Sequence, residues 1–264
     1  MHDMLRAIFA YRFFIISSVK NDLKIRFLRS KLGTLWMIIH PLTQVLIFAL
    51  ILSEVLSAKL PGIDNKYAYA LYLMAGTLGW SLFAETITKC VSLFIDNANL
   101  MKKMAFPRIC LPLITLGTMF VQNMLLLLAI FIVFAVLGHV PGLQVLWLPV
   151  LTVLTLLLSL SLGTLLGVLN VFVRDIGQVI PVFLQALFWL TPIVYNIEIL
   201  PASTQAWFRL NPLYPLITSY QNVLVYNKPP LWGELVGLTM ATLVLGVISL
   251  MVFRRASAEM VDVL

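Results

Sequence analysis

Residues 102–113 read KKMAFPRICLPL, and this stretch separates two long apolar runs. It holds three cations and two prolines, Pro107 and Pro112. An apolar run of about 20 residues is long enough to cross the hydrocarbon core of a bilayer as a helix. Because the stretch is basic and interrupted by proline, we interpret it as a cytoplasmic joint between two membrane-spanning helices.

The composition indicates an integral membrane protein. Of the 264 residues, 61% are hydrophobic and only 11% are charged, and the mean hydropathy is +0.99. A soluble domain has about 45–50% apolar and about 25% charged residues. We therefore expect an all-α membrane protein in which residues 1–264 form a single transmembrane domain.

Six apolar runs are long enough to span a membrane, and we expect each to be a transmembrane helix. They are Leu35–Leu56, Tyr69–Phe94, Leu111–Leu137, Leu143–Val173, Val179–Tyr195 and Leu235–Phe253. The fifth is the shortest and the weakest candidate.

Positive charge alternates between the segments that join these runs. One set of segments holds thirteen of the 18 Lys and Arg residues: 1–34, 96–110, 174–178 and 254–264. The alternate segments hold only four: 57–68, 138–142 and 196–234. Because cytoplasmic loops carry the excess of Lys and Arg, we expect both termini in the cytoplasm, a cytoplasmic tail at 254–264 and an outer segment at 196–234.

Residues 1–32 are expected to form an amphipathic helix. At 100° per residue one face of it is apolar: Leu5, Ile8, Phe9, Ile15, Ile16, Val19, Leu23 and Phe27. Such a helix can lie in the membrane surface, with Arg12 and Arg26 reaching the lipid head groups. The alternative is a cytoplasmic helix that packs on the bundle.

The 196–234 segment mixes prolines with aromatic residues. The aromatic residues include Trp207, Phe208, Tyr214, Tyr220 and Tyr226. Trp and Tyr are enriched at membrane interfaces, and a long loop without regular structure is uncommon. We expect short outer helices that dip into the interface, with a plain aromatic anchor as the alternative.

Few ionisable or small-residue patterns occur inside the runs. Glu85 and Lys89 are one helical turn apart in the order that favours pairing, so we expect a structural ion pair. The motifs GTLLG at 163–167 and GELVG at 233–237 permit close helix approach, either within one chain or between two.

The chain contains no catalytic motif. It lacks a G-x-x-x-x-G-K-[ST] phosphate loop, an H-E-x-x-H helix and a G-x-S-x-G elbow. Cys90 and Cys110 have no histidine cluster near them in the sequence, so neither a zinc site nor a disulfide framework is indicated. We expect no enzyme activity, no cofactor or metal in this chain and no nucleic-acid partner.

Four stretches carry a family resemblance: FLRSKLGTLWMIIHPL at 27–42, NANLMKKMAFPRICLPL at 97–113, VRDIGQVIPVFLQALFWLTPIVY at 173–195 and LNPLYPLITSYQNVL at 210–224. Together they resemble the membrane subunit of bacterial polysaccharide ABC exporters, the permeases for capsule, O-antigen or teichoic-acid chains. The Asn-Leu-Met-Lys-Lys stretch followed by Phe-Pro-Arg and Leu-Pro is the most specific. The resemblance implies a homodimeric permease of the bacterial inner membrane, with ATP and Mg bound by a separate ATP-binding subunit.

The same resemblance implies that residues 96–110 couple this chain to the ATP-binding subunit. The residues expected to do so are Asn97, Asn99, Leu100, Met101, Lys102, Lys103, Phe106, Pro107 and Arg108. Asn97 or Asn99 can cap a short helix that Pro107 stops. We expect its apolar members to dock in a pocket of the partner. A solvated basic loop is the alternative, but it leaves those apolar residues unexplained.

The implied substrate is a lipid-linked polysaccharide, which we expect to be O-antigen, crossing between two permease subunits. Aromatic rings can stack on the apolar faces of sugars. The candidate pore-lining residues, with lipid-facing anchors as the alternative, are Trp80, Phe83, Phe188, Trp189 and Tyr195. The candidate pyrophosphate contacts, with attraction to anionic lipid as the alternative, are Arg26, Arg29, Lys31 and Arg108.

Two other functions stay open on the sequence alone. A permease of the same fold can export a drug or another small lipophile, for which we expect a narrow pathway with few aromatic residues. An ion-coupled carrier that works alone is the third candidate. It needs a buried acid that is free to titrate, and the spacing of Glu85 and Lys89 argues against one.

Overall fold

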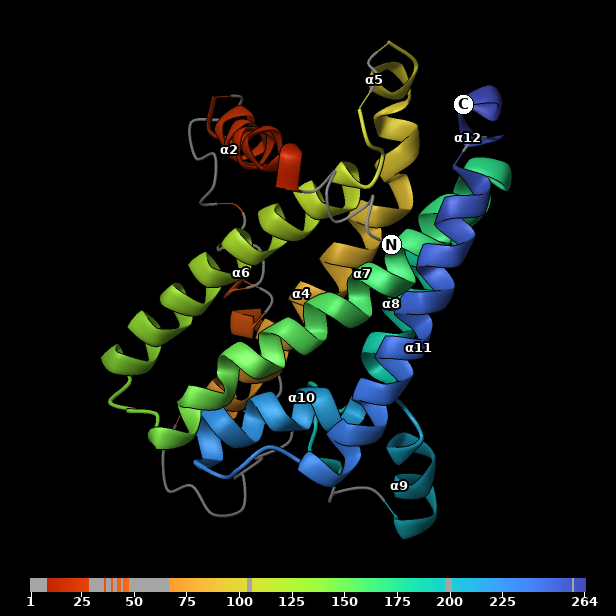
Figure 1. Ribbon diagram of the computed structural model, residues 1–264. Coiled ribbons are helices and arrows are strands. Elements are labelled where there is room, and N and C mark those ends of the chain that lie inside the picture. Colours follow the sequence, from red (N-terminus) through yellow and green to blue (C-terminus); the bar gives the residue numbers. More distant parts are fainter. Residues whose placement is uncertain are drawn as a thin grey trace.

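The computed structural model describes residues 9–28, 67–103, 106–197, 201–257 and 259–264, with isolated positions between 36 and 47. Every regular element in these ranges is a helix (Figure 1). Four of the described helical stretches are long and apolar enough to cross a membrane: α4 (Ala68–Asp96), α6 (Cys110–Val136), the 3-10 turn η1 with α7 (Leu143–Phe172) and α11 (Trp232–Ala256). Their ends lie within three residues of the second, third, fourth and sixth expected runs.

Two of the six expected spans are not seen as such. The first, Leu35–Leu56, lies mostly outside the described residues. In the fifth, Val179–Tyr195, helix α8 covers Ile176–Trp189 and the chain then turns through residues 190–197. The 14 residues of α8 extend about 21 Å, less than a hydrocarbon core of about 30 Å. The prediction of one continuous helix over the fifth run is therefore wrong, and Pro192 explains the end, because the residue before a proline avoids the helical conformation.

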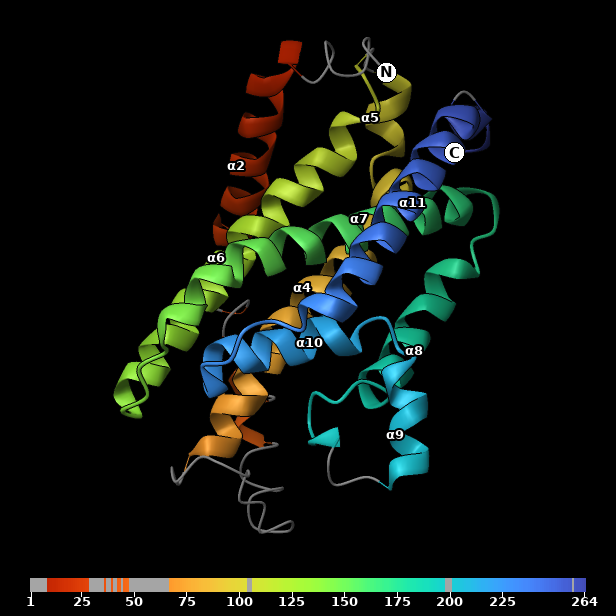
Figure 2. The ribbon, with the colours of Figure 1, turned by 60° about the horizontal axis from the view of Figure 1, so that its bottom comes forward.

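Helix α4 lies at the centre of the bundle and contacts α6, α7, α8 and α10 (Figures 1 and 2). Where α7 meets α4, a Cβ atom on Gly167 would collide with the carbonyl oxygen of Cys90, and one on Gly163 would lie 2.7 Å from the Cβ atom of Cys90. The GTLLG motif therefore lets two helices of one chain approach closely. A Cβ atom on Gly233 or Gly237 would meet no described atom within 4 Å.

The N-terminal helix packs on the bundle by one side. Helix α2 covers Arg12–Leu28 and contacts α6, where Val19 lies against Gly117. Away from this contact Phe13 is exposed, and the Arg12 guanidinium lies 4.8 Å from the centre of the Phe13 ring. The packed side agrees with a helix docked on the bundle, and its placement in the membrane surface stays a prediction.

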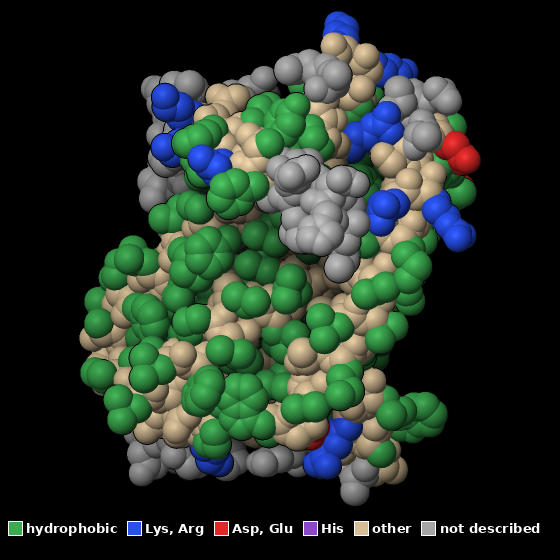
Figure 3. All heavy atoms as spheres, in the orientation of Figure 1, with side chains coloured by type: hydrophobic (Ala, Val, Ile, Leu, Met, Phe, Trp, Pro, Cys, Tyr) green, Lys and Arg blue, Asp and Glu red, His purple; other side chains and the backbone are tan. Residues whose placement is uncertain are grey.

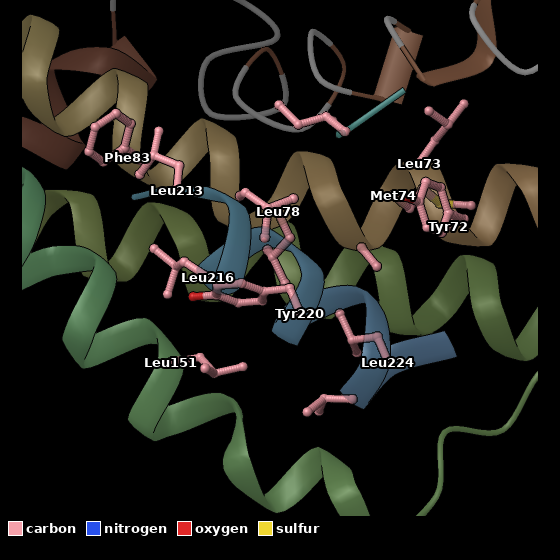
Figure 4. Close-up of a cluster of buried hydrophobic side chains, with 14 of the residues drawn as sticks. Tyr72, Leu73, Met74, Leu78, Phe83, Leu151, Leu213, Leu216, Tyr220 and Leu224 are labelled. Carbon is pink, nitrogen blue, oxygen red and sulfur yellow. The ribbon is translucent and has the colours of Figure 1, made fainter. Parts of the chain in front are cut away.

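Short helices form the 196–234 segment, as predicted: α9 (Ala202–Arg209), α10 (Tyr214–Gln221) and the π-helical turn η3 (Asn222–Tyr226). Helix α9 exposes Trp207, but α10 is not a surface anchor. Its Tyr220 is fully buried in one core cluster with Leu78 (Figure 4). The Tyr220 hydroxyl lies 3.1 Å from that of Thr155. Burial raises the pKa of Tyr220 to about 12, so this hydroxyl stays protonated.

The molecule has two ends of different character (Figures 1 and 2). One end, which we call the α5 end, carries α5 (Ala98–Lys103), the start of α6 and α12 (Glu259–Val263). The opposite end, which we call the α10 end, carries α9, α10 and η3. Lys and Arg side chains gather at the α5 end, and hydrophobic side chains cover the band between the two ends (Figure 3).

Candidate functional site

The expected coupling helix, α5, begins directly after α4 ends. The side-chain nitrogen of Asn97 donates to the carbonyl of Leu93 over 2.8 Å, so Asn97 caps the carboxyl end of α4 and not the amino end of α5. Its own carbonyl accepts the first bond of α5, from the Met101 nitrogen over 3.0 Å. The Pro107 carbonyl accepts from the Cys110 nitrogen over 2.9 Å and begins the turn into α6.

Met101 faces the inside of its own chain. Its side chain is 6% exposed and lies in a cluster with Phe94, Phe253 and Met260 of α12. The rings of Phe94 and Phe253 stack with centres 5.7 Å apart. Leu100 is half-buried against the same cluster. The expectation that Met101 docks in a pocket of a partner is therefore wrong, because the chain supplies that pocket itself.

The outward side of α5 is polar. The residues exposed on it are Asn99, Lys102 and Lys103. Beyond α5, the ring of Phe106 lies 5.6 Å from that of Phe14 on α2. Arg108 donates to the Ser257 hydroxyl over 3.0 Å, which joins the start of α6 to the end of α11. The α5 end therefore brings N-terminal, central and C-terminal parts of the chain together.

The four candidate pyrophosphate contacts are only partly described. Arg26 lies in α2 but its side chain is outside the described part, and Arg29 and Lys31 are also outside it. Arg108 is half-buried and bonded to Ser257. A cluster of these four cations therefore stays a prediction.

Four of the five pore-lining candidates form one aromatic cluster between α4 and α8. The ring centre of Trp80 lies 6.0 Å from Phe83 and 5.5 Å from Phe188, which lies 5.6 Å from Trp189. Phe83 and Phe188 are buried, Trp80 is half-buried and Trp189 is exposed. Within one chain, the two buried rings support a wall, and Trp80 and Trp189 form its surface.

The fifth candidate, Tyr195, follows α8 in the chain. Its hydroxyl donates to the Trp189 carbonyl over 2.7 Å, and its ring lies 5.8 Å from Phe208 of α9. It therefore belongs to the turn after α8, which we call the α8 break (residues 190–197).

Side chains from α4 and from α10 hold the carbonyl groups of the α8 break. The Tyr69 hydroxyl donates to the Val194 carbonyl over 2.6 Å. The Tyr72 hydroxyl and the Gln221 side-chain nitrogen each donate to the Pro192 carbonyl over 3.2 Å. Residues 191–194 are buried, and buried backbone groups that leave a helix need other partners, which these bonds supply. The sequence analysis missed this arrangement, because Tyr69 and Tyr72 lie more than a hundred residues before the carbonyl groups that they bond.

Glu85 has a partner on another helix. The Gln122 side-chain nitrogen on α6 donates to the Glu85 carboxylate, and that of Asn123 donates to the Leu78 carbonyl over 3.3 Å. Lys89, the expected partner of Glu85, is exposed. Within the described ranges no group of three or more His, Cys, Asp or Glu residues is placed to hold a metal ion.

Asn170 joins three helices at the start of α8. It is 3% exposed, its nitrogen donates to the Val91 carbonyl over 2.9 Å, and its oxygen accepts from the Gly177 nitrogen over 2.8 Å. The sequence analysis missed it. An amide alone inside an apolar run is the signal that points to it, because a buried amide needs partners.

Comparison with known proteins gives one family and several relatives. The profile of the ABC-2 type transporter family matches residues 15–225. The O-antigen export system permease protein of Klebsiella pneumoniae is 27% identical over 257 residues, which cover 96% of each chain. A protein of the same description from Myxococcus xanthus is 27% identical over 93% of each chain. The polysialic acid transport protein of Escherichia coli is 22% identical over 91% of this chain and 92% of its own.

Proposed function

The chain belongs to the ABC-2 type transporter family, and from this premise we propose that it is the transmembrane subunit of an ATP-driven polysaccharide exporter. The substrate in this proposal is a lipid-linked glycan, O-antigen first. The observation that carries it is the alignment with three relatives named for O-antigen or polysialic acid transport, over at least 91% of this chain. The four long apolar helices suit such a multi-pass protein of the bacterial inner membrane.

A separate subunit binds and hydrolyses ATP in this proposal, and it docks at the α5 end. The cations gathered there support a cytoplasmic position for that end, because cytoplasmic loops are rich in Lys and Arg. The docking surface is the exposed side of α5, which carries Asn99, Lys102 and Lys103. Two copies of the chain form the exporter, and the glycan passes between them along Trp80 and Trp189.

Deletion of the gene tests the function. We expect surface polysaccharide to be lost and lipid-linked glycan to accumulate in the cytoplasm, with both restored by a plasmid copy. Drug susceptibility should not change, which separates a glycan exporter from an exporter of small lipophiles. The proposal fails if the deletion strain displays normal surface polysaccharide.

Single cysteines test the orientation. In a variant without Cys90 and Cys110, a cysteine at Ser203 of α9 and one at Glu259 of α12 occupy exposed positions at opposite ends. An impermeant thiol reagent applied to intact cells should label position 203 and leave position 259 unlabelled. The reverse result would place the α5 end outside.

A further inference from the structure

A pocket of about 400 Å³ opens at the α10 end beside the α8 break. It is lined by Tyr72, Pro192, Asn196, Ile197, Tyr214, Thr218, Gln221, Asn222, Tyr226 and Lys228. Pockets that hold small ligands typically measure about 300–1,000 Å³. Tyr72, Tyr214 and Gln221 are buried and form its floor, whereas Lys228 is exposed and marks its mouth.

The helix α10 and the turn η3 divide their residues between the core and this pocket. Leu216 and Tyr220 face the core, where both are fully buried. Tyr214, Thr218 and Asn222 follow one another at intervals of four residues, which places them on the opposite side. A helix packed inside a membrane protein gains little from a polar side unless that side meets a polar partner or ligand.

The side chains around the pocket define the chemistry of its ligand. Tyrosine rings offer flat apolar walls, and amide groups can both donate and accept hydrogen bonds. Among the described residues, the lining of the pocket holds no carboxylate, which a calcium or magnesium site requires. An acyl chain is also a poor fit, because it offers no hydrogen bond to the amide and hydroxyl groups of the lining. Apolar ring faces bordered by many hydroxyl groups are the features of a sugar.

The pocket is also linked mechanically to the α8 break. Tyr72 and Gln221 form its floor, and the same two side chains hold the Pro192 carbonyl. A ligand on this floor therefore contacts the groups that fix the end of α8. In transporters, backbone that leaves a helix inside the membrane commonly lines a substrate site.

We propose that this pocket binds one sugar unit of the glycan that the exporter moves, on the side where the chain leaves the membrane. The inference rests on the proposed function and adds a site to it. The rings of Tyr72, Tyr214 and Tyr226 hold the sugar by its apolar faces, and Asn222 and Thr218 bond its hydroxyl groups.

Photo-crosslinking in exporting cells tests the site. The photoreactive residue p-benzoylphenylalanine is placed at position 226, inside the pocket, or at position 207, a control on α9 whose tryptophan is 74% exposed at the same end. After irradiation the chain is purified and stained for attached glycan. We expect at least about fivefold more glycan on the position 226 variant, and none in a strain that cannot synthesise the glycan.

A double variant of the pocket gives a second measurement. Removal of the two predicted hydroxyl partners, in Thr218→Ala with Asn222→Ala, should slow export about tenfold, because each hydrogen bond typically contributes a few-fold. The control, Thr239→Ala, removes the hydroxyl of an exposed residue of α11 that donates to the Leu235 carbonyl of its own helix over 2.7 Å. Membrane levels of both variants are measured by immunoblot, so that a folding defect is recognised.

The outcomes separate this inference from the proposed function. Equal crosslinking at 226 and 207 in cells that export normally, or normal export by a Thr218→Ala, Asn222→Ala variant, would overturn the sugar site and leave the exporter assignment intact. Normal surface glycan after deletion of the gene would overturn both.

Discussion

The α5 end and the α10 end use their conspicuous residues in opposite ways. At the α5 end the sequence is basic, and Lys102 and Lys103 lie on the surface. At the α10 end the sequence is aromatic, and Tyr220 lies fully buried in the core. A lysine is almost never buried without a partner, so its position follows from its charge. A tyrosine can be core, surface or ligand contact, so its position follows only from what packs on it.

This difference also separates what the two ends offer to other molecules. The α5 end presents a polar outer side over an internal cluster that includes Met101. The α10 end presents a pocket, and two residues of its floor, Tyr72 and Gln221, also bond the backbone of the α8 break. A partner protein can dock at the first end without changing the fold, whereas a ligand at the second contacts the residues that end α8.

The largest loss of stability is expected from replacement of Tyr220, the buried aromatic residue of the α10 end. Tyr220→Ala should destabilise the chain by about 3–5 kcal/mol, because it removes a fully buried ring and leaves a cavity. Trp207→Ala on α9, the matched aromatic control at the same end, should change stability by less than about 1 kcal/mol, since Trp207 is 74% exposed. Thermal unfolding in detergent, monitored by size-exclusion chromatography, measures the stability of both variants. A similar loss in both variants would mean that α10 is not core.

Four of the six spans could be predicted from the sequence, because a run of about 20 apolar residues has few alternatives in a bilayer. The end of α8 could not be predicted in the same way. Apolarity continues past Trp189, and Pro192 alone does not show where the freed carbonyl groups find partners, which the bonds from Tyr69, Tyr72 and Gln221 do. Hydropathy records which side chains tolerate lipid, and it does not record where carbonyl groups find partners.

In the candidate sites, too, features that depend on local sequence could be predicted and features that depend on distant contacts could not. The position of α5 and its exposed lysines follows from local signals, namely charge and proline. The burial of Met101 does not, because Met260 is far away in the sequence. The pocket beside the α8 break was missed for this reason too, since its lining comes from α4, the break and α10.

Met101→Ala gives the second largest effect and tests the inner side of α5. Loss of this buried side chain should cost about 2–3 kcal/mol, at the low end for a buried methionine because α5 is short. Asn99→Ala, on the exposed side of the same helix, should be neutral in stability. Hydrogen exchange of α5 and α12 measures the change. Unaltered exchange in Met101→Ala would show that Met101 does not hold these two helices together.

Arg108 provides a smaller test of the same end. Arg108→Ala removes the 3.0 Å hydrogen bond to Ser257, and we expect a loss of about 0.5–1.5 kcal/mol. Ser257→Ala should cause a comparable loss, and the double variant should be little worse than either single one, because both remove one interaction. Additive losses in the thermal unfolding of the three variants would show that Arg108 acts through another contact.

The smallest effect on stability and the clearest effect on assembly are expected at Lys102 and Lys103. Exposed charges contribute about 0–1 kcal/mol, so Lys102→Ala with Lys103→Ala should unfold at the same temperature as the unchanged chain. If the ATP-binding subunit docks on this side of α5, the double variant should retain less of it at low salt, because charges at the rim of an interface mainly govern association. The difference should shrink in about 1 M salt, where the screening length falls to about 3 Å.

Arg254→Ala with Arg255→Ala is the matched control, since these two cations are also exposed but lie at the end of α11. Equal partner retention by both double variants at low salt would show that the α5 lysines mark only a cytoplasmic loop and not a docking surface.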